Sequence, residues 1–351
     1  MKFATVTAVL LMIIVCVLLP KLPAIHTWAV EREEERIAEA ELAEQKITMS
    51  DLTIKNTEVA DDTEQRQLRL KLPAGVKGSD ITISNDYVTQ TVRIELPQTE
   101  VSYFENDPLT GSSNHIDNLS YAVSRGSSGL IEITMDQVYE LDMDYDENYY
   151  YFDFLTPHEV YDKVVVVDAG HGGNDVGETV VEQDVSLQEK DITLAAVQKA
   201  GELLLAQGIR VYYTREDDSS RSPEERVGFA NALQADMLIS VHVTSAEDTK
   251  VYGIRTEYNA QYFIPDFSSA DLAYLLLTEV AESTNEKALD IVPGQDDNVV
   301  IGEAVIPVAQ LDIGFLSNRQ ERKLLQRNVY IEKVAQGICN AVLLAYKEME
   351  K

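Results

Sequence analysis

The sequence is poor in cysteine and in basic side chains, and both shortages limit what the protein can be. Of its two cysteines, Cys16 lies in an apolar run and Cys339 in a segment with helical character, so we expect no disulfide between them. The 29 lysines and arginines are outnumbered by 60 aspartates and glutamates, and the net charge is −31. Because phosphate backbones are bound by basic surfaces, we expect no nucleic-acid partner.

Long apolar runs are also scarce, and the one that stands out lies at the N-terminus. Residues 3–19 carry no charge and follow Lys2, which is typical of an export signal. As a helix, this run reaches about 25 Å, slightly short of a hydrocarbon core of about 30 Å. No clean cleavage site follows, which favours an uncleaved signal anchor over a cleaved signal peptide. We therefore predict a signal anchor or signal peptide over residues 1–30, with the rest of the chain exported.

Glutamate dominates the segment that follows. Residues 31–46 contain seven glutamates among alanine, isoleucine and leucine. This composition predicts an acidic linker over residues 31–47, either a polar helical stalk or a disordered spacer.

Apolar side chains recur at every second position in several runs of residues 48–160. Proline and glycine separate these runs, as they do between strands, and the pattern predicts a small antiparallel β domain. The alternating residues are Leu68, Leu70 and Leu72, then Val92, Ile94 and Leu96, and then Ile131, Ile133 and Met135.

The remaining part, residues 161–351, alternates predicted strands with predicted helices. Lys163–Asp168, Met237–His242 and Val305–Ile313 are apolar runs of strand length, rich in β-branched residues. A capping box with proline in the first turn, Ser222–Glu225, predicts the start of a helix. This alternation predicts a three-layer α/β domain with a mostly parallel sheet.

Residues of metal-binding or acid–base type lie at the ends of these strands. His171, His242 and Asp312 follow or end apolar runs, and Glu189 lies just ahead of a predicted helix. In open α/β sheets, ligands collect beyond the carboxyl ends of the strands, so we expect these four side chains to converge. Two histidines and a glutamate form a three-ligand zinc set with an open fourth position, as metallohydrolases need. Asp312 is then a candidate proton carrier.

Two carboxylates near these motifs, Glu189 and Asp168, can each be interpreted in two ways. Glu189 is also placed to stabilise a helix N-terminus by its charge. Asp168, at the end of its strand, is a candidate hydrogen-bond acceptor for a ligating imidazole or a turn former. The histidines outside the motifs, His26, His115 and His158, are not expected to contribute to the site.

At four segments the chain resembles the zinc N-acetylmuramoyl-L-alanine amidases of the family-3 type. The segments are V-V-V-V-D-A-G-H-G-G (164–173), L-Q-E-K-D (187–191), L-I-S-V-H-V (238–243) and V-A-Q-L-D-I-G-F-L-S-N (308–318). The family has D-P-G-H-G-G, a K-E-K-D-like turn, S-I-H-A-N and P-A-V-L-V-E-L-G-F-L-S-N in the same order. The resemblance covers about residues 162–346 and implies a phosphorylase/hydrolase-like catalytic domain over residues 161–351.

The resemblance also implies a reaction, a metal and a location. His171, Glu189 and His242 match the family's Zn²⁺ ligands, and the implied reaction hydrolyses the amide between N-acetylmuramic acid and the L-alanine of the stem peptide. Peptidoglycan is then the partner, and the protein is membrane-anchored or secreted to the bacterial cell wall, contacting the membrane only through its N-terminal segment. The β-rich region resembles AMIN-type modules in its position ahead of an amidase domain.

Asp312 is the main departure from the family pattern, because it falls where the family has its catalytic glutamate. The missing methylene withdraws the carboxylate by roughly 1.5 Å, and a misplacement of about 1 Å can cost ~10²-fold in rate. One hypothesis is an amidase that uses Asp312 as its base, with Glu178 or Glu182 as substitutes. The alternatives are a degenerate amidase that binds cell-wall fragments and a zinc peptidase that cuts within the stem peptide. Smaller departures are Ala169 for proline and Val243-Thr244 for alanine-asparagine.

Overall fold

The structure is a computed structural model of the whole chain. It describes residues 46–47, 66–106, 109–111, 113–123, 128–182, 185–261, 265–294 and 297–350. The predicted signal segment and nearly all of the predicted acidic linker lie outside these residues. Within them, no helix combines the length and the apolar character needed to span a bilayer.

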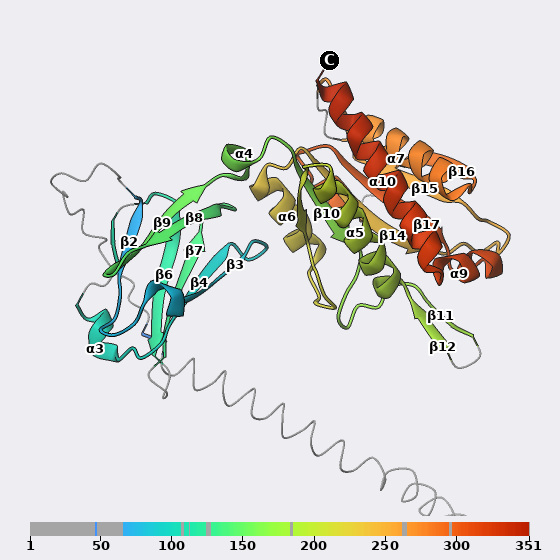
Figure 1. Cartoon of the computed structure of the whole chain (residues 1–351). Coiled ribbons are helices and arrows are strands. Elements are labelled where there is room, and N and C mark those ends of the chain that lie inside the picture. The colour runs from blue at the N-terminus through green and yellow to red at the C-terminus, as the bar shows by residue number, and fades with distance from the viewer. Residues whose placement is uncertain are drawn as a thin grey trace, which may run out of the picture. The chain divides into compact units, whose positions relative to one another are not determined.

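The N-terminal part of the described chain is built from two small sheets. One has the strand order β1-β6-β7-β4-β3 and the other β5-β2-β9-β8 (Figure 1). The pairs β1–β6 and β2–β5 are antiparallel. The bounds are β1 Lys46–Ile47, β2 Leu68–Lys71, β3 Thr82–Asp86, β4 Thr91–Leu96, β5 Leu109–Gly111, β6 Ile116–Val123, β7 Gly129–Met135, β8 Glu140–Tyr145 and β9 Tyr149–Leu155, with the short helices η2 Gly78–Asp80, α3 Val101–Phe104 and α4 Pro157–Val160.

The period-two pattern of this region corresponds to alternating burial. Leu68 and Leu70 are fully buried, as are Ile131 and Ile133, while the residues between them are partly exposed. The chain divides into two compact units, and the segments Asn85–Thr91 and Met135–Met143 belong to the second unit. A separate antiparallel domain over residues 48–160 therefore stays a prediction.

The second unit contains a six-stranded mixed sheet with the order β13-β10-β14-β17-β15-β16. All pairs are parallel except β15–β17, which is antiparallel. The bounds are β10 Val164–Ala169, β13 Arg210–Tyr213, β14 Met237–Thr244, β15 Ile254–Tyr258, β16 Ala288–Pro293 and β17 Val308–Phe315. The expectation of a mostly parallel sheet is met in part, because one edge reverses direction at β15.

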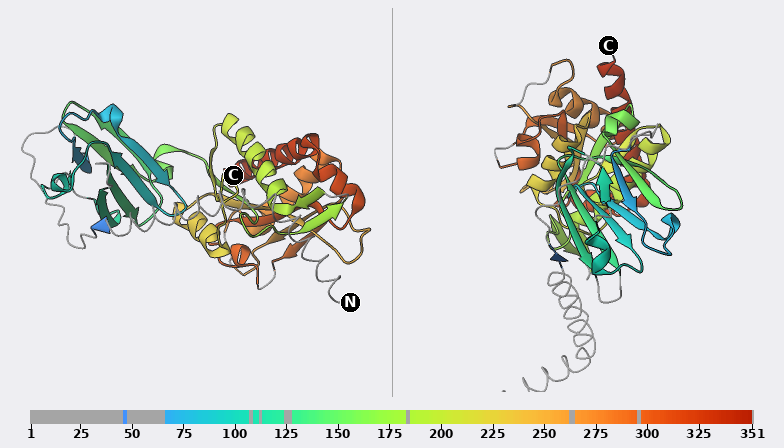
Figure 2. Two further views of the ribbon diagram at one scale, coloured as in Figure 1. Left: turned by 90° about the horizontal axis from the view of Figure 1, so that it is seen from below. Right: turned by 90° about the vertical axis from the view of Figure 1, so that its left-hand side faces the viewer.

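Helices cover both faces of this sheet. On one face, α5 (Glu189–Ala206), α7 (Ser269–Thr284) and α10 (Asn328–Met349) pack on the core that contains Val165 and Val167 (Figures 1 and 2). On the other face, α6 (Pro223–Leu233) and α8 (Val299–Gly302) pack on the core that contains Val164 and Val166. A strand buried on both faces reads as a continuous β-branched run, which explains the four valines of β10.

Several boundaries differ from the sequence-based expectation. The helix that was expected to follow Glu189 begins at Glu189 itself, so this glutamate lies in its first turn. The segment of helical character that contains Cys339 is α10, and Arg327, in an extended conformation, separates it from the short helix α9 (Arg319–Leu325). The hairpin β11 (Thr179–Glu182) and β12 (Val185–Gln188) was not predicted. The capping box at Ser222 and Glu225 is confirmed.

Candidate metal centre

His171 lies just beyond the end of β10 in a strained turn. Its φ angle is +66°, in the left-handed region that side chains with a Cβ rarely adopt. The backbone bridge between Gly172 and Asp175 closes the turn, and the Asp175 carboxylate contacts Nδ1 of His171 at 2.9 Å. Nε2 of the same ring faces Glu189, with 3.1 Å between Nε2 and Oε2. The loop therefore presents one ring nitrogen of His171 to the interior of the site.

Glu189 is the most buried of the three residues, with 2% of its side chain exposed. Its Oε1 accepts a hydrogen bond from the backbone N–H of Val243 at 2.8 Å and lies 2.9 Å from Nδ1 of His242. Its Oε2 accepts from the N–H of Glu178 at 2.8 Å. Burial alone would raise the pKa of Glu189, but the hydrogen bonds to His171 and His242 hold it far below the usual value. The carboxylate is thus fixed and anionic.

His242 projects from β14 beside the fully buried Asp168. The oxygens of Asp168 accept hydrogen bonds from Thr214 and Ser240, each at 2.5 Å, and Arg226 adds an ion pair at 3.2 Å. The hydrogen bonds of the Asp168 carboxylate are thus made with Thr214, Ser240 and Arg226 rather than with an imidazole. The hypothesis that Asp168 orients a ligand fits the structure less well than the pairing of His171 with Asp175.

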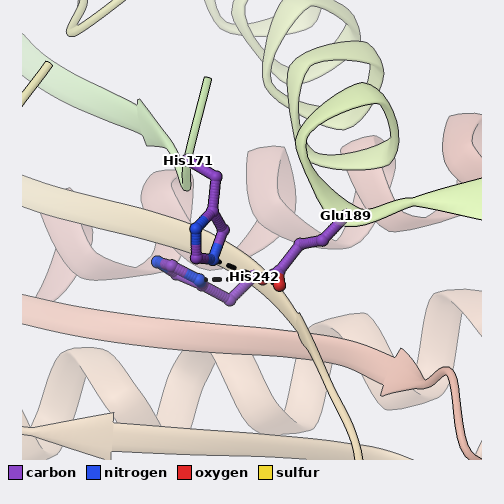
Figure 3. A group of neighbouring side chains, drawn as sticks. All are labelled: His171, Glu189 and His242. Atoms are coloured by element: carbon purple, nitrogen blue, oxygen red, sulfur yellow. Dashed lines mark hydrogen bonds and ion pairs between the residues drawn. The ribbon is translucent and has the colours of Figure 1, made fainter. Parts of the chain in front are cut away.

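Donor atoms of His171, Glu189 and His242 all lie within 4.8 Å of one another (Figure 3). In a tetrahedral zinc site with bonds of about 2.0–2.1 Å, two donors are about 3.4 Å apart. The 2.9 and 3.1 Å separations between the histidine nitrogens and the Glu189 oxygens are close to that value. The chemistry of this donor set, two imidazoles and one carboxylate, therefore fits a zinc ion.

Two glycines leave room for these side chains. A Cβ atom on Gly170 would lie 2.4 Å from Cε1 of His242. A Cβ atom on Gly177 would lie 2.5 Å from Oε2 of Glu189 and 2.6 Å from Cδ2 of His171. Such contacts are too short for any side chain, so the backbone passes as close to the donor set as glycine permits.

Asp312 is not a free carboxylate in this structure. It is 1% exposed and pairs with Arg255, whose Nε and Nη2 lie 2.9 and 2.7 Å from Oδ2. Its Oδ1 accepts a hydrogen bond from Nε2 of Gln310 at 3.0 Å. In the parallel register of β14 and β17, Asp312 is the partner of His242, so the expected convergence beside the trio holds.

The Arg255–Asp312 pair belongs to a closed circuit of five side chains. Asn298 donates to Gln310 at 2.9 Å and to Glu257 at 3.3 Å, and the second oxygen of Glu257 lies 3.4 Å from Arg255. Burial raises the pKa of Glu257, and the nearby charge of Asp312 raises it further. We refer to Arg255, Glu257, Asn298, Gln310 and Asp312 as the polar circuit.

A cavity of about 450 Å³ opens beside the trio and the polar circuit. His171, Glu189, His242 and Asp312 line it, as does Glu178. The side chain of Glu182 lies outside what the structure describes. The other lining residues are Asp175, Gly177, Arg221, Pro223, Arg226, Val243, Thr244, Asp297, Asn298, Val299, Val300 and Gln310.

The sequence reasoning missed Asp175 and the partners of Asp312. Asp175 follows His171 by four residues in a glycine-rich loop. This spacing could have indicated that the Asp175 carboxylate orients the His171 imidazole. Arg255 and Glu257 alternate along β15 and so share one face, but only the antiparallel register, which opposes Arg255 to Asp312, shows their target.

Comparison with known proteins places these residues in a family. The model of the N-acetylmuramoyl-L-alanine amidase family matches residues 165–343. The uncharacterized protein YqiI of Bacillus subtilis is 30% identical over 184 residues, which is 51% of this chain and 83% of that protein. The germination-specific N-acetylmuramoyl-L-alanine amidase of the same organism is 29% identical over 203 residues, covering 53% and 81%.

A solved structure with a similar sequence is also that of an N-acetylmuramoyl-L-alanine amidase. The catalytic domain of CwlV, an N-acetylmuramoyl-L-alanine amidase from Bacillus (Paenibacillus) polymyxa var. colistinus, is 30% identical, covers 53% of this chain and 98% of that one, and has a TM-score of 0.48. The family match at residues 165–343 spans slightly more than half of the sequence. The chain therefore belongs to the family-3 N-acetylmuramoyl-L-alanine amidases.

Proposed function

We propose that this protein is a peptidoglycan hydrolase that cleaves the amide between N-acetylmuramic acid and the L-alanine of the stem peptide. The family membership supports the reaction class. The observation that carries the proposal is the clustering of His171, Glu189 and His242 at the wall of one cavity, at the carboxyl ends of the strands. We further propose that this half has the phosphorylase/hydrolase-like fold.

The trio would hold a zinc ion through one atom each of His171, Glu189 and His242. When bound there, zinc would lower the pKa of a water molecule and polarise the substrate carbonyl. Asp175 holds the His171 ring, and the N–H groups of Val243 and Glu178 hold the Glu189 carboxylate. These contacts fix the donors before any ligand arrives, which reduces the cost of reorganisation.

We assign the proton transfers to Asp312. Its Oδ2 is held by the Arg255 cation, whereas the partner of its Oδ1 among the described residues is the neutral amide of Gln310. Oδ1 is therefore the atom that can exchange its partner and accept a proton from the attacking water. The same oxygen would return that proton to the leaving nitrogen of L-alanine. Arg255 keeps Asp312 in place through this exchange.

The location and the remaining segments belong to the same proposal. A cell-wall substrate requires that the amidase half lie outside the cytoplasmic membrane, and residues 1–30 would supply the export signal or anchor. The acidic segment 31–47 would then act as a spacer, and the β-rich residues 48–160 would form a domain that precedes the catalytic residues 161–351.

Digestion of purified sacculi tests the proposal. The protein should release stem peptides whose new amino terminus is L-alanine, with zinc present and not after chelation. His171→Ala and His242→Ala should lose both zinc and activity, because each removes one of three ligands. If the zinc-loaded parent releases nothing but still binds sacculi, the amidase is degenerate. Release of amino acids from within the stem peptide would instead indicate a peptidase.

A further inference from the structure

Two arginines line the cavity beside the trio, and their hydrogen bonding differs. Arg226 is fully engaged: its guanidinium donates to the carbonyl oxygens of Arg221, Ala169 and His171 and pairs with Asp168. Arg221 makes one long ion pair, 3.5 Å from Nη2 to Oδ2 of Asp86. Its Nε is buried and has no hydrogen-bond partner among the residues that the structure describes.

The charge of the cavity makes this difference informative. Apart from the two arginines and the two histidines, the ionisable residues that line it are all acidic; they are Asp175, Glu178, Glu189, Asp297 and Asp312. An anionic ligand group is repelled by such a wall unless it meets a cation. With Arg226 already committed, Arg221 is the lining cation that has donors to offer.

Arg221 is also positioned by the same residues that position the trio. Its carbonyl oxygen accepts from Nε of Arg226 at 2.9 Å, and Nη2 of Arg226 donates to the carbonyl of His171 at 2.8 Å. Arg226 thus ties the backbone of Arg221 to the His171 loop. The next residue, Ser222, caps α6, which fixes the backbone where Arg221 emerges. With 23% of its side chain exposed, Arg221 is accessible to a ligand.

We propose that Arg221 forms an anion subsite that binds a free carboxylate of the stem peptide during amide cleavage. The guanidinium fork matches a carboxylate in a bidentate arrangement, and a ligand carboxylate would replace the long contact to Asp86. The inference rests on the proposed amidase function, because the substrate peptide supplies the carboxylate. It adds a determinant of specificity, since peptides whose carboxylate is amidated would be bound more weakly.

A pair of substrates and a pair of variants test this subsite. The substrates are N-acetylmuramoyl-L-alanyl-D-glutamic acid and the analogue in which the α-carboxylate of glutamate is a carboxamide. The zinc-loaded parent should cleave the acid with a kcat/KM about 10- to 100-fold higher, the range for a charged hydrogen-bond pair. Arg221→Gln should lose that preference, because it should lower kcat/KM for the acid and leave kcat/KM for the carboxamide unchanged. Arg221→Lys should keep part of the preference. Zinc content and thermal stability identify any variant that has lost its fold.

Lys347→Gln is the control for net charge. Lys347 is exposed in the last turn of α10. Its neighbour Tyr346 donates to Asp236, which also accepts from the N–H of Val164 at the start of β10, so Lys347 lies near the amino ends of the strands and the trio at their carboxyl ends. This variant should keep the substrate preference of the parent. Equal preference in Arg221→Gln and the parent, or no preference in the parent, overturns the subsite.

Direct binding separates this inference from the proposed function. Calorimetry with the free dipeptides L-alanyl-D-glutamic acid and its α-carboxamide needs no catalysis. A parent that cleaves neither substrate but prefers the acid, with the preference lost in Arg221→Gln, would refute the amidase proposal and retain the subsite. Cleavage of both substrates without any preference for the acid would support the amidase proposal and refute the subsite. Arg221→Gln with lower stability and an unchanged preference would limit Arg221 to its ion pair with Asp86.

Discussion

Replacing Gly177 by alanine should damage the candidate metal centre without unfolding the protein. Gly177 has a φ of +64°, so an alanine there costs about 1–2 kcal/mol for its left-handed conformation. The new Cβ would also lie 2.5 Å from Oε2 of Glu189 and 2.6 Å from a ring carbon of His171. Relief of these contacts requires a shift of about 1 Å, whereas zinc sites tolerate about 0.2 Å in their bond lengths.

Gly208→Ala is a matched control for this perturbation. Gly208 has a φ of +75°, but a Cβ built on it meets no atom within 4 Å. It therefore has the same backbone cost and no contact with a ligand. Both variants should melt a few degrees below the parent, by about 2–4 °C per kcal/mol for a domain of this size. Only Gly177→Ala should bind zinc more weakly, by about 10- to 100-fold, the loss typical of disturbed ligand support.

Competition with a chromophoric zinc chelator measures the affinities, and thermal unfolding followed by circular dichroism measures the shared cost. The comparison cancels the backbone term and leaves the contact with Glu189 and His171. Equal zinc affinity in Gly177→Ala, Gly208→Ala and the parent would refute the arrangement of the trio. A loss of affinity in both variants would show that backbone strain rather than contact with the ligands is responsible.

Three further predictions concern carboxylates. Asp312→Asn should keep zinc and lower kcat by about 10²–10⁴-fold, the range for a positioned proton carrier; an unchanged kcat would eliminate Asp312 and favour Glu178. Arg255→Met should lower the free energy of unfolding by about 3 kcal/mol, because it leaves the buried carboxylates of Glu257 and Asp312 without their cation. Adding Glu257→Gln should recover part of this loss; equal denaturant midpoints for the single and double variants would contradict the prediction. Burial raises the pKa of Glu321 to about 7, so the folded state binds its proton more tightly than the unfolded state. Stability should then fall by about 3 kcal/mol between roughly pH 4.5 and 7 through this residue, and Glu321→Gln, compared with the parent by denaturation across that range, should lose this slope; an identical slope would refute the assignment.

The convergence of His171 and His242, two of the three candidate metal ligands, could be predicted because it follows from strand periodicity and sheet topology. The valines of β10 alternate between two cores, which fixes the strand and places its carboxyl end near His171. In the same way, the apolar run of β14 predicts where His242 emerges. Residues at the ends of parallel neighbours come together whatever the connecting loops do, so strand periodicity suffices to bring the two histidines together. Glu189 lies in the first turn of α5 rather than at the end of a strand of this sheet, and its position was expected from the L-Q-E-K-D motif.

The surroundings of Asp312 could not be predicted, because they depend on one antiparallel register. β15 runs antiparallel to β17, and a parallel alignment would not oppose Arg255 to Asp312. The burial of Asp312 could not be predicted either, because nothing in the segment Q-L-D distinguishes a solvated aspartate from one that is 1% exposed. The hairpin β11–β12 was not predicted either, since its short strands pair with each other and with no other strand in the part of the chain that the structure describes.

Product analysis by mass spectrometry tests the central claim most directly. A defined muropeptide, incubated with the zinc-loaded protein, should yield the intact stem peptide with a free L-alanine amino terminus and a glycan that carries a free lactyl carboxylate. The same reaction after zinc removal should yield neither product. Products in which the muramoyl–alanine bond is intact, or cleavage that is unaffected by removing zinc, would contradict a zinc-dependent N-acetylmuramoyl-L-alanine amidase.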